Sequence, residues 1–153
     1  MKRLLTPLSL LVALAALLSA CVNHSKILAN GLDIEVTAIE RSSDGAVAVS
    51  WHVKNSNIVS YLISRVNHKI QLNGTSLGTI DEVEALAVPA NSNAGRTSKL
   101  ARVGAVAEQA LIEAAKTGTA SYHVDSQVTI LIYDDTVEKS VLNHSGTVAV
   151  TTK

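Results

Sequence analysis

Residues 47–54 read Val-Ala-Val-Ser-Trp-His-Val-Lys, which alternates large apolar side chains with small or polar ones. A period of two is typical of a β-strand with one buried face, so this segment predicts a strand facing the core. Trp51, the only tryptophan, has the apolar parity and is the predicted core anchor. The preceding Ser-Ser-Asp-Gly at residues 42–45 predicts a turn, which makes this strand the second arm of a hairpin.

The same period of two recurs along much of the chain. In the preceding strand the apolar parity holds Leu32, Ile34, Val36 and Ala38, and Asn73-Gly74 is a strong hairpin signal. Residues 128–133 are apolar on both faces, which favours a central strand. The predicted strands are residues 32–38, 47–54, 65–72, 77–80, 85–88, 120–124, 128–133 and 147–151, with weaker apolar segments at 58–63 and 97–101.

One helical pattern interrupts the strands. Apolar residues recur at helical spacing and the pattern ends at Gly118; they are Val103, Val106, Ala107, Ala110, Leu111, Ala114 and Ala115. The stripe lacks the Lys/Arg-rich polar face of a membrane-binding helix, so we expect it to pack on its own sheet rather than dock a partner or a membrane. Short strands with one helix predict a mostly β fold, an antiparallel β-sandwich of about seven strands.

Composition excludes several functions. The chain has 153 residues, with 13 Lys+Arg against 13 Asp+Glu spread along the sequence, and no basic patch suited to nucleic acid. One Cys forms neither an intramolecular disulfide nor a multi-thiolate metal site. We therefore expect a domain held together by its core.

The first twenty residues have the pattern of a secretory signal. Lys2 and Arg3 precede an almost uninterrupted apolar run over residues 4–18, which is shorter than the roughly 20 residues of a membrane-spanning helix. The run ends in Leu18-Ser19-Ala20-Cys21, which resembles the lipobox of bacterial lipoproteins. The resemblance implies that Cys21 is thioether-linked to a diacylglyceryl group, that the chain is cut before it, and that its new amine is acylated. The alternative is an ordinary signal peptide with an incidental Cys.

The lipobox resemblance divides the chain into a signal peptide at residues 1–20, a lipidated tether at 21–31 and a domain at 32–151. Val22 stands where Asp would retain a lipoprotein at the inner membrane, which implies the outer membrane with the domain facing the periplasm. Loss of Lys2 and Arg3 leaves 11 basic residues against 13 acidic ones, so the mature chain is mildly acidic.

Several motifs in order resemble late-embryogenesis-abundant type 2 (LEA type 2) proteins, also called the WHy (water stress and hypersensitive response) domain. The motifs are residues 45–54, Asn55-Ser56-Asn57, residues 70–78, 88–92 and 118–124, and the resemblance covers about residues 31–151. The family is similar in fold to fibronectin-type sandwiches, which implies an immunoglobulin/fibronectin-III-like β-sandwich. The family typically has Asn-Pro-Asn where this chain has Ser56 in the middle, so the turn lacks the φ restraint of proline.

The resemblance implies a non-enzymatic protein associated with desiccation, cold and other stress, with no catalytic residues, cofactor or small-molecule substrate. Its expected partners are the membrane, through the lipid, and client proteins bound weakly. The alternative is an accessory module that docks one specific envelope protein through a strand edge or loop end.

Other chemistry has weaker signals. His52 and His123 have outward parity and form a metal or proton site only if their strands are neighbours, whereas His68 shares its parity with core residues. We expect isolated surface histidines and a hydrogen-bonded core or rim histidine, with no metal site. The acidic clusters, residues 81–84 and 134–135, lack the alternating oxygen ligands and glycine of a Ca²⁺ loop and are expected to be solvated.

Overall fold

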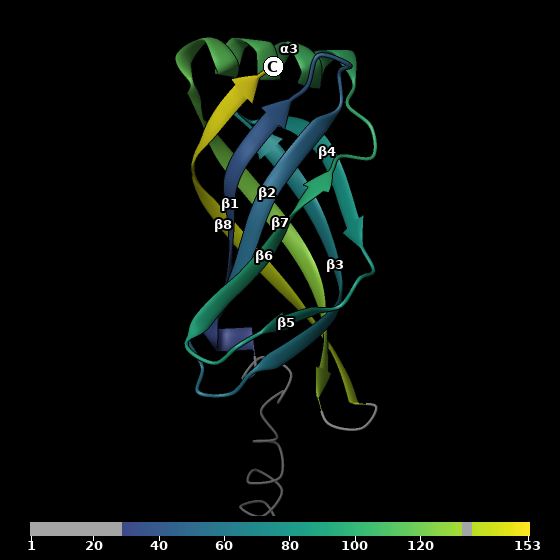
Figure 1. Cartoon of the computed structure of the whole chain (residues 1–153), viewed down its shortest axis with the longest axis vertical. Helices are drawn as coiled ribbons and strands as arrows, with labels where there is room; N and C mark the ends of the chain where they lie inside the picture. The colour runs from purple at the N-terminus through teal and green to yellow at the C-terminus, as the bar shows by residue number, and fades with distance from the viewer. Residues whose placement is uncertain (1–28, 133–135) are drawn as a thin grey trace, which may run out of the picture.

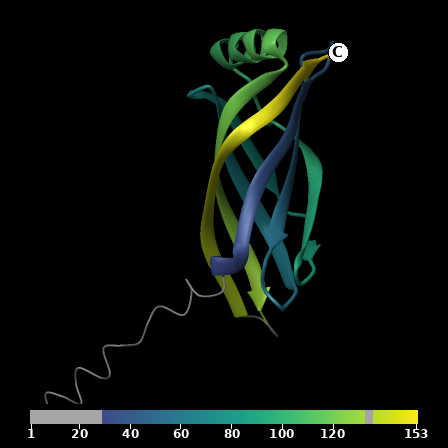
Figure 2. The same ribbon diagram turned by 90° about the vertical axis from the view of Figure 1, so that its left-hand side faces the viewer.

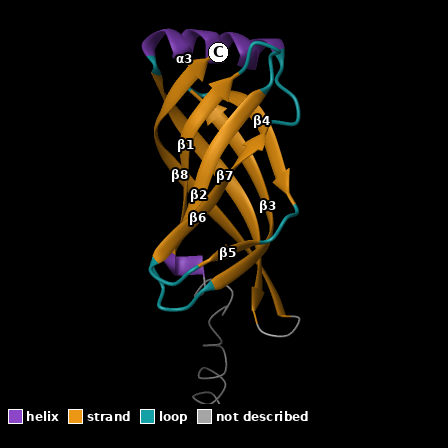
Figure 3. Cartoon of the chain, viewed as in Figure 1, coloured by secondary structure: helices purple, strands orange, loops and turns teal. Residues whose placement is uncertain are grey.

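The computed structural model describes residues 29–132 and 136–153, and most of them lie in β-strands (Figure 3). A short 3₁₀ helix, η1 (Ala29–Gly31), leads into the first strand. The strands and the α-helix follow in this order: β1 (Leu32–Arg41), β2 (Val47–Asn55), β3 (Tyr61–Leu72), β4 (Thr75–Glu82), β5 (Leu86–Val88), β6 (Ser92–Lys99), α3 (Ala105–Thr117), β7 (Thr119–Ile132) and β8 (Thr136–Thr152). The predicted mostly β fold with one helix is confirmed.

All strands belong to one curled sheet rather than to two separate sheets. Its order is β4-β3-β7-β8-β1-β2-β6, with β5 paired to β3 (Figure 1). Pairing is antiparallel except between β1 and β8, which are parallel. The predicted antiparallel sandwich is therefore corrected. Two antiparallel groups do exist, β4-β3-β7-β8 with β5 and β1-β2-β6, but the pairing of β1 with β8 joins them into a continuous sheet.

The junction of β1 with β8, called the parallel seam below, is short. It pairs residues 38–41 of β1 with residues 149–152 of β8. Nearer the start of β1, the Val36 amide instead donates to the hydroxyl of Tyr122 on β7, at 3.2 Å. His144 Nδ1 lies 3.1 Å from Asp33 Oδ1 across the same gap. Side chains thus replace the backbone ladder where the two strands separate.

Trp51 anchors the core, as predicted. Its side chain is buried, and its ring lies edge-on to the ring of His68, with centroids 4.5 Å apart. Trp51 Nε1 donates to Ser98 Oγ at 3.1 Å. Because Trp51 is on β2 and His68 is on β3, in different groups of the sheet, their contact spans the interior of the curl.

Two of the β-bulges explain where the two-residue period fails in β1 and β3. The β1–β2 register shifts between Val36 and Ala38, so that Ile39 rather than Ala38 enters the core, and the prediction for Ala38 was wrong. A second shift, at Ser64, lets Ile63 and Val66 both point inward. Residues 61–63 of the first predicted segment and the segment 65–72 consequently form one strand, β3, with a bulge, and residues 58–60 precede it.

The helix covers one end of the curled sheet, beside the C-terminus (Figure 2). It buries Ala107, Leu111 and Ala114, as expected for packing on its own sheet, whereas Val106 is exposed. Gly118 ends it in the left-handed conformation, with φ of +77°. A side chain is strained there, which is why glycine commonly terminates helices.

The last two strands are longer than the pattern predicts. β7 runs through both predicted segments at 120–124 and 128–133, and β8 extends well before residue 147. In residues 29–132 and 136–153, no helix is long and apolar enough to cross a bilayer.

Candidate functional site at the base of the sheet

The Asn55-Ser56-Asn57 turn lies at the end of the sheet where the chain enters, which we call the base. Asn55, the last residue of β2, pairs with Leu32 at the start of β1. Its side chain is fully buried, and its Nδ2 donates to the carbonyls of Val59 at 2.8 Å and Pro89 at 3.0 Å. Its Oδ1 accepts from the Asn57 amide at 2.9 Å. One amide group therefore ties the β2–β3 turn to the β5–β6 turn.

The neighbouring residues fasten the incoming chain to this turn. Ser56 N donates to the Gly31 carbonyl at 2.7 Å, and Asn91 N donates to the Asn57 carbonyl at 2.9 Å. A Cβ on Gly31 would lie 2.2 Å from the Asn57 side chain, so only glycine fits without displacing it. The base is thus a hydrogen-bonded platform that connects η1 with two loops.

In the platform, the backbone N–H of Ser56 donates a hydrogen bond. The proline that is usual at this position in the LEA type 2 family could not make it. Proline has no backbone N–H and could not donate to Gly31. In this chain the middle residue of the turn instead holds the entering segment, through the 2.7 Å bond.

An apolar row lies on the outer face of the sheet at the base. Leu62 on β3 pairs with Leu131 on β7, and Leu131 pairs with Val137 on β8. All three side chains are exposed. The sequence pattern did not predict this row, because the bulge at Ser64 shifts the parity of Leu62 and because residues 128–133 are apolar on both faces, as in a covered strand.

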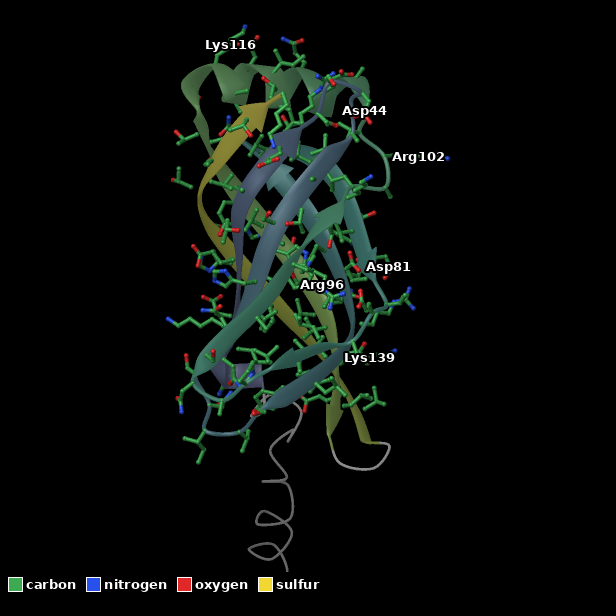
Figure 4. The ribbon with its side chains drawn as sticks, in the orientation of Figure 1. Asp44, Asp81, Arg96, Arg102, Lys116 and Lys139 are labelled. Carbon is green, nitrogen blue, oxygen red and sulfur yellow. The ribbon has the colours of Figure 1, made fainter. Side chains whose placement is uncertain are left out.

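A shallow groove of about 790 Å³ lies beside the row, across the outer faces of β3, β7 and β8. Lys139, labelled in Figure 4, lines it from β8 together with Arg65 from β3. The remaining lining mixes polar and apolar surface and consists of Ser64, Asn67, Gln127, Val128, Thr129, Ser140 and Val141. An open groove of mixed character across three strands suits an extended chain better than a small apolar ligand.

The histidines of the described ranges do not converge on a metal site. β8 and β1 separate the strands of His52 and His123, so the two side chains lie apart. His52 Nε2 lies 3.2 Å from Glu35, and His123 Nε2 lies 3.2 Å from Asp125. His68 is buried and bonds Ser126 Oγ through Nδ1 at 2.7 Å, as expected for a core histidine. Over the described ranges, no group of three or more His, Cys, Asp or Glu is arranged to hold a metal ion.

The acidic residues 81–84 lie at a strand end, as expected, and have basic neighbours. Arg65 Nε donates to Asp81 at 2.9 Å, and this bond holds the pKa of the Asp81 carboxyl below its usual value. Arg96 Nη1 lies 3.0 Å from Glu84 and 3.8 Å from Glu82. Figure 4 labels Asp81 and Arg96. Residues 134–135, and Leu18, Ser19, Ala20 and Cys21 of the predicted lipobox, lie outside the described residues.

Comparisons with known proteins give only distant likenesses in structure. No protein-family model matches the chain, and no curated protein matches it. A crystal structure of a protein from Archaeoglobus fulgidus is 16% identical, with a TM-score of 0.48, over 78% of this chain and 95% of that one. A solution structure of a protein from Arabidopsis thaliana is 14% identical, with a TM-score of 0.48, over 79% of this chain and 80% of that one. The solution structure of a putative late embryogenesis abundant (LEA) protein is 14% identical, with a TM-score of 0.44, over 94% of this chain and 88% of that one. These values do not assign a family.

Proposed function

We propose that this chain is a non-enzymatic, lipid-anchored periplasmic protein of the LEA type 2/WHy kind that protects envelope proteins or the membrane during water, cold or desiccation stress. The observation that carries the proposal is the joint presence of Leu18-Ser19-Ala20-Cys21 and the ordered family motifs of residues 31–151 in one sequence. The mostly β fold and the buried Asn55 turn are compatible with it.

The outer faces of the sheet support weak contact with many clients. The exposed positions of β1 include Asp33, Glu35 and Glu40, and those of β8 include Asn143 and Thr147. Apart from the apolar row at the base and Val141, such a surface offers mainly hydrogen-bonding groups. Weak polar contacts of this kind would keep partially unfolded proteins apart without holding one partner tightly.

Replacing the lipidated residue tests the anchor. A Cys21→Ser protein lacks the thiol to which the diacylglyceryl group is attached, so we expect it to leave the membrane fraction and become soluble in the periplasm. Ser25→Ala, four residues further along, leaves the lipobox intact and should stay with the membrane. Immunoblots of fractionated cells measure both. Persistent membrane association of the Cys21→Ser protein would contradict lipid anchoring.

Protection of a test enzyme examines the stress role. We expect residues 22–153 to preserve more activity of a freeze-sensitive dehydrogenase through repeated freezing and thawing than an equal mass of an unrelated β-sandwich. The control separates a specific effect from simple protein crowding, which is weak. Equal protection by the two proteins would remove the support for a protective role.

A second function, docking of one envelope protein, is favoured by the groove across β3, β7 and β8, where Arg65 and Lys139 lie among polar side chains. Cross-linking in intact cells distinguishes the two functions. One stoichiometric partner indicates an accessory module, and a diffuse set of products indicates a general protective protein.

A further inference from the structure

The base carries a concentration of exposed apolar side chains. Leu62, Leu131 and Val137, neighbours on three adjacent strands, are 40%, 38% and 51% exposed. The β2–β3 turn adds Ile58, 87% exposed, and Val59, 47% exposed. We call these five residues the base patch. Five of the eight large hydrophobic residues exposed in the described part of the chain therefore belong to one end of the molecule.

The surface becomes polar immediately beyond the patch. The next set of paired residues on the outer face is Arg65, Thr129 and Lys139. Arg65 is paired with Asp81, whereas Lys139 is exposed and projects from the lower part of the sheet in Figure 4. An apolar tip followed by a lysine is an arrangement in which the aliphatic part of lysine extends along a membrane interface while its ammonium stays hydrated.

The patch lies where the chain enters the sheet. The Ser56–Gly31 bond joins η1 to the turn that holds Ile58 and Val59, and both ribbon views place η1 at the end opposite α3 (Figures 1 and 2). Cys21 is eight residues before Ala29 in the sequence. Eight extended residues span at most about 29 Å, so lipid on Cys21 keeps the base close to the bilayer.

We propose that the base patch docks on the lipid surface to which the chain is anchored, so that the long axis of the sheet stands away from the membrane. The proposal rests on the lipid anchoring of Cys21 proposed above. The occupant is the interfacial region of the bilayer, because the short tether presents that surface to this end of the domain. Docking leaves α3 and the C-terminus facing the periplasm.

Depth-sensitive fluorescence tests the docking with the full, lipidated chain in liposomes of phosphatidylethanolamine and phosphatidylglycerol. An environment-sensitive dye is attached to Val137→Cys or, as the matched control, to Val106→Cys, an exposed valine on α3 at the opposite end. Thioether-linked Cys21 does not react. Lipids with a nitroxide near the headgroup should quench the dye at 137 by roughly half and leave the dye at 106 unchanged, because interfacial side chains enter about 5–10 Å.

Three outcomes would overturn the proposal. If the liposomes carry the protein on flotation but the two dyes are quenched equally, docking is wrong while anchoring stands. If the dye at 137 is shielded from aqueous iodide yet not quenched by the lipid, protein covers the patch instead. If the protein does not float, the anchor itself is wrong. Fluorescence of Trp51 checks that both variants are folded.

Discussion

Lowering the pH from 7 to 4 is expected to destabilise the folded protein by about 3 kcal/mol through one imidazole, that of His68. The ring is fully buried between Trp51 and Ser126, and its Nε2 has no hydrogen-bond partner among the described residues. Burial lowers the pKa of His68 from 6.5 to about 4. The imidazolium form has lost its hydration and has no carboxylate beside it to compensate.

The direction of the effect follows from proton uptake. Between pH 6.5 and 4 the unfolded chain binds a proton at His68 that the folded chain does not, so stability falls as the pH falls through this window. The carboxyls of Asp44, Asp81 and Glu113 have lowered pKa values, held down mainly by Ser42, Arg65 and Lys116. The stability that these carboxylates contribute begins to be lost only when the pH falls to near the ordinary carboxyl pKa values of 3.8 and 4.5.

Urea unfolding of residues 22–153 at pH 7, 5.5 and 4, followed by the fluorescence of Trp51, measures the effect. His68→Gln keeps a side-chain amide near Ser126 but does not titrate, so it should lose most of the dependence on pH between 6.5 and 4. His123→Gln, on the outer face of β7, should retain it. An unchanged pH dependence in the His68→Gln protein would show that His68 is not the responsible group.

The second large effect is expected at Asn55, whose replacement by alanine should cost about 2–4 kcal/mol of unfolding free energy. The change removes the donor to the Val59 and Pro89 carbonyls and the acceptor of the Asn57 amide. Because Asn55 is fully buried, water does not readily replace these bonds. Asn55→Asp should cost more, since a buried carboxylate would then face two carbonyl oxygens.

An exposed asparagine provides the matched control. Asn93 lies on β6 with an exposed side chain, and Asn93→Ala should change stability by less than about 0.5 kcal/mol. Urea midpoints at pH 7 give all three values. If Asn55→Ala proved as mild as Asn93→Ala, the base would not depend on the buried amide, and its loops would have to be held by the Ser56–Gly31 contact and side-chain packing.

The local sequence pattern predicted the individual strands, turns and helix better than it predicted how the strands pair in the sheet. The alternation around Trp51, the Asn73-Gly74 turn and the helix ending at Gly118 each reflect a physical rule that acts within a few residues. The bulges at Thr37 and Ser64 add one residue to one strand only, and no sequence period marks such an addition. Ala38 was therefore assigned to the core face wrongly, and Ile39 and Leu62 were assigned to no face.

The long-range pairing depended on information that lies outside any one segment. The parallel seam joins residues 38–41 to 149–152, which are at opposite ends of the domain sequence. The apolar row similarly requires the register of three strands at once, because Leu62, Leu131 and Val137 are unremarkable singly. The Asn55 turn, by contrast, was found through its resemblance to a family motif, and the structure supplies the hydrogen bonds that explain its side chains.

The parallel seam also sets how the molecule resists mechanical force. β1 and β8 run in the same direction, and the chain enters at the base and ends at Lys153 beside α3 (Figure 1). Lys153 N additionally donates to the Arg41 carbonyl at 2.9 Å. Tension between the two termini therefore slides β8 along β1 and loads these bonds together in shear, whereas tension across a hairpin breaks them one after another. A load applied at Lys153 and resisted where β1 begins at the base meets the domain in its stronger mechanical direction.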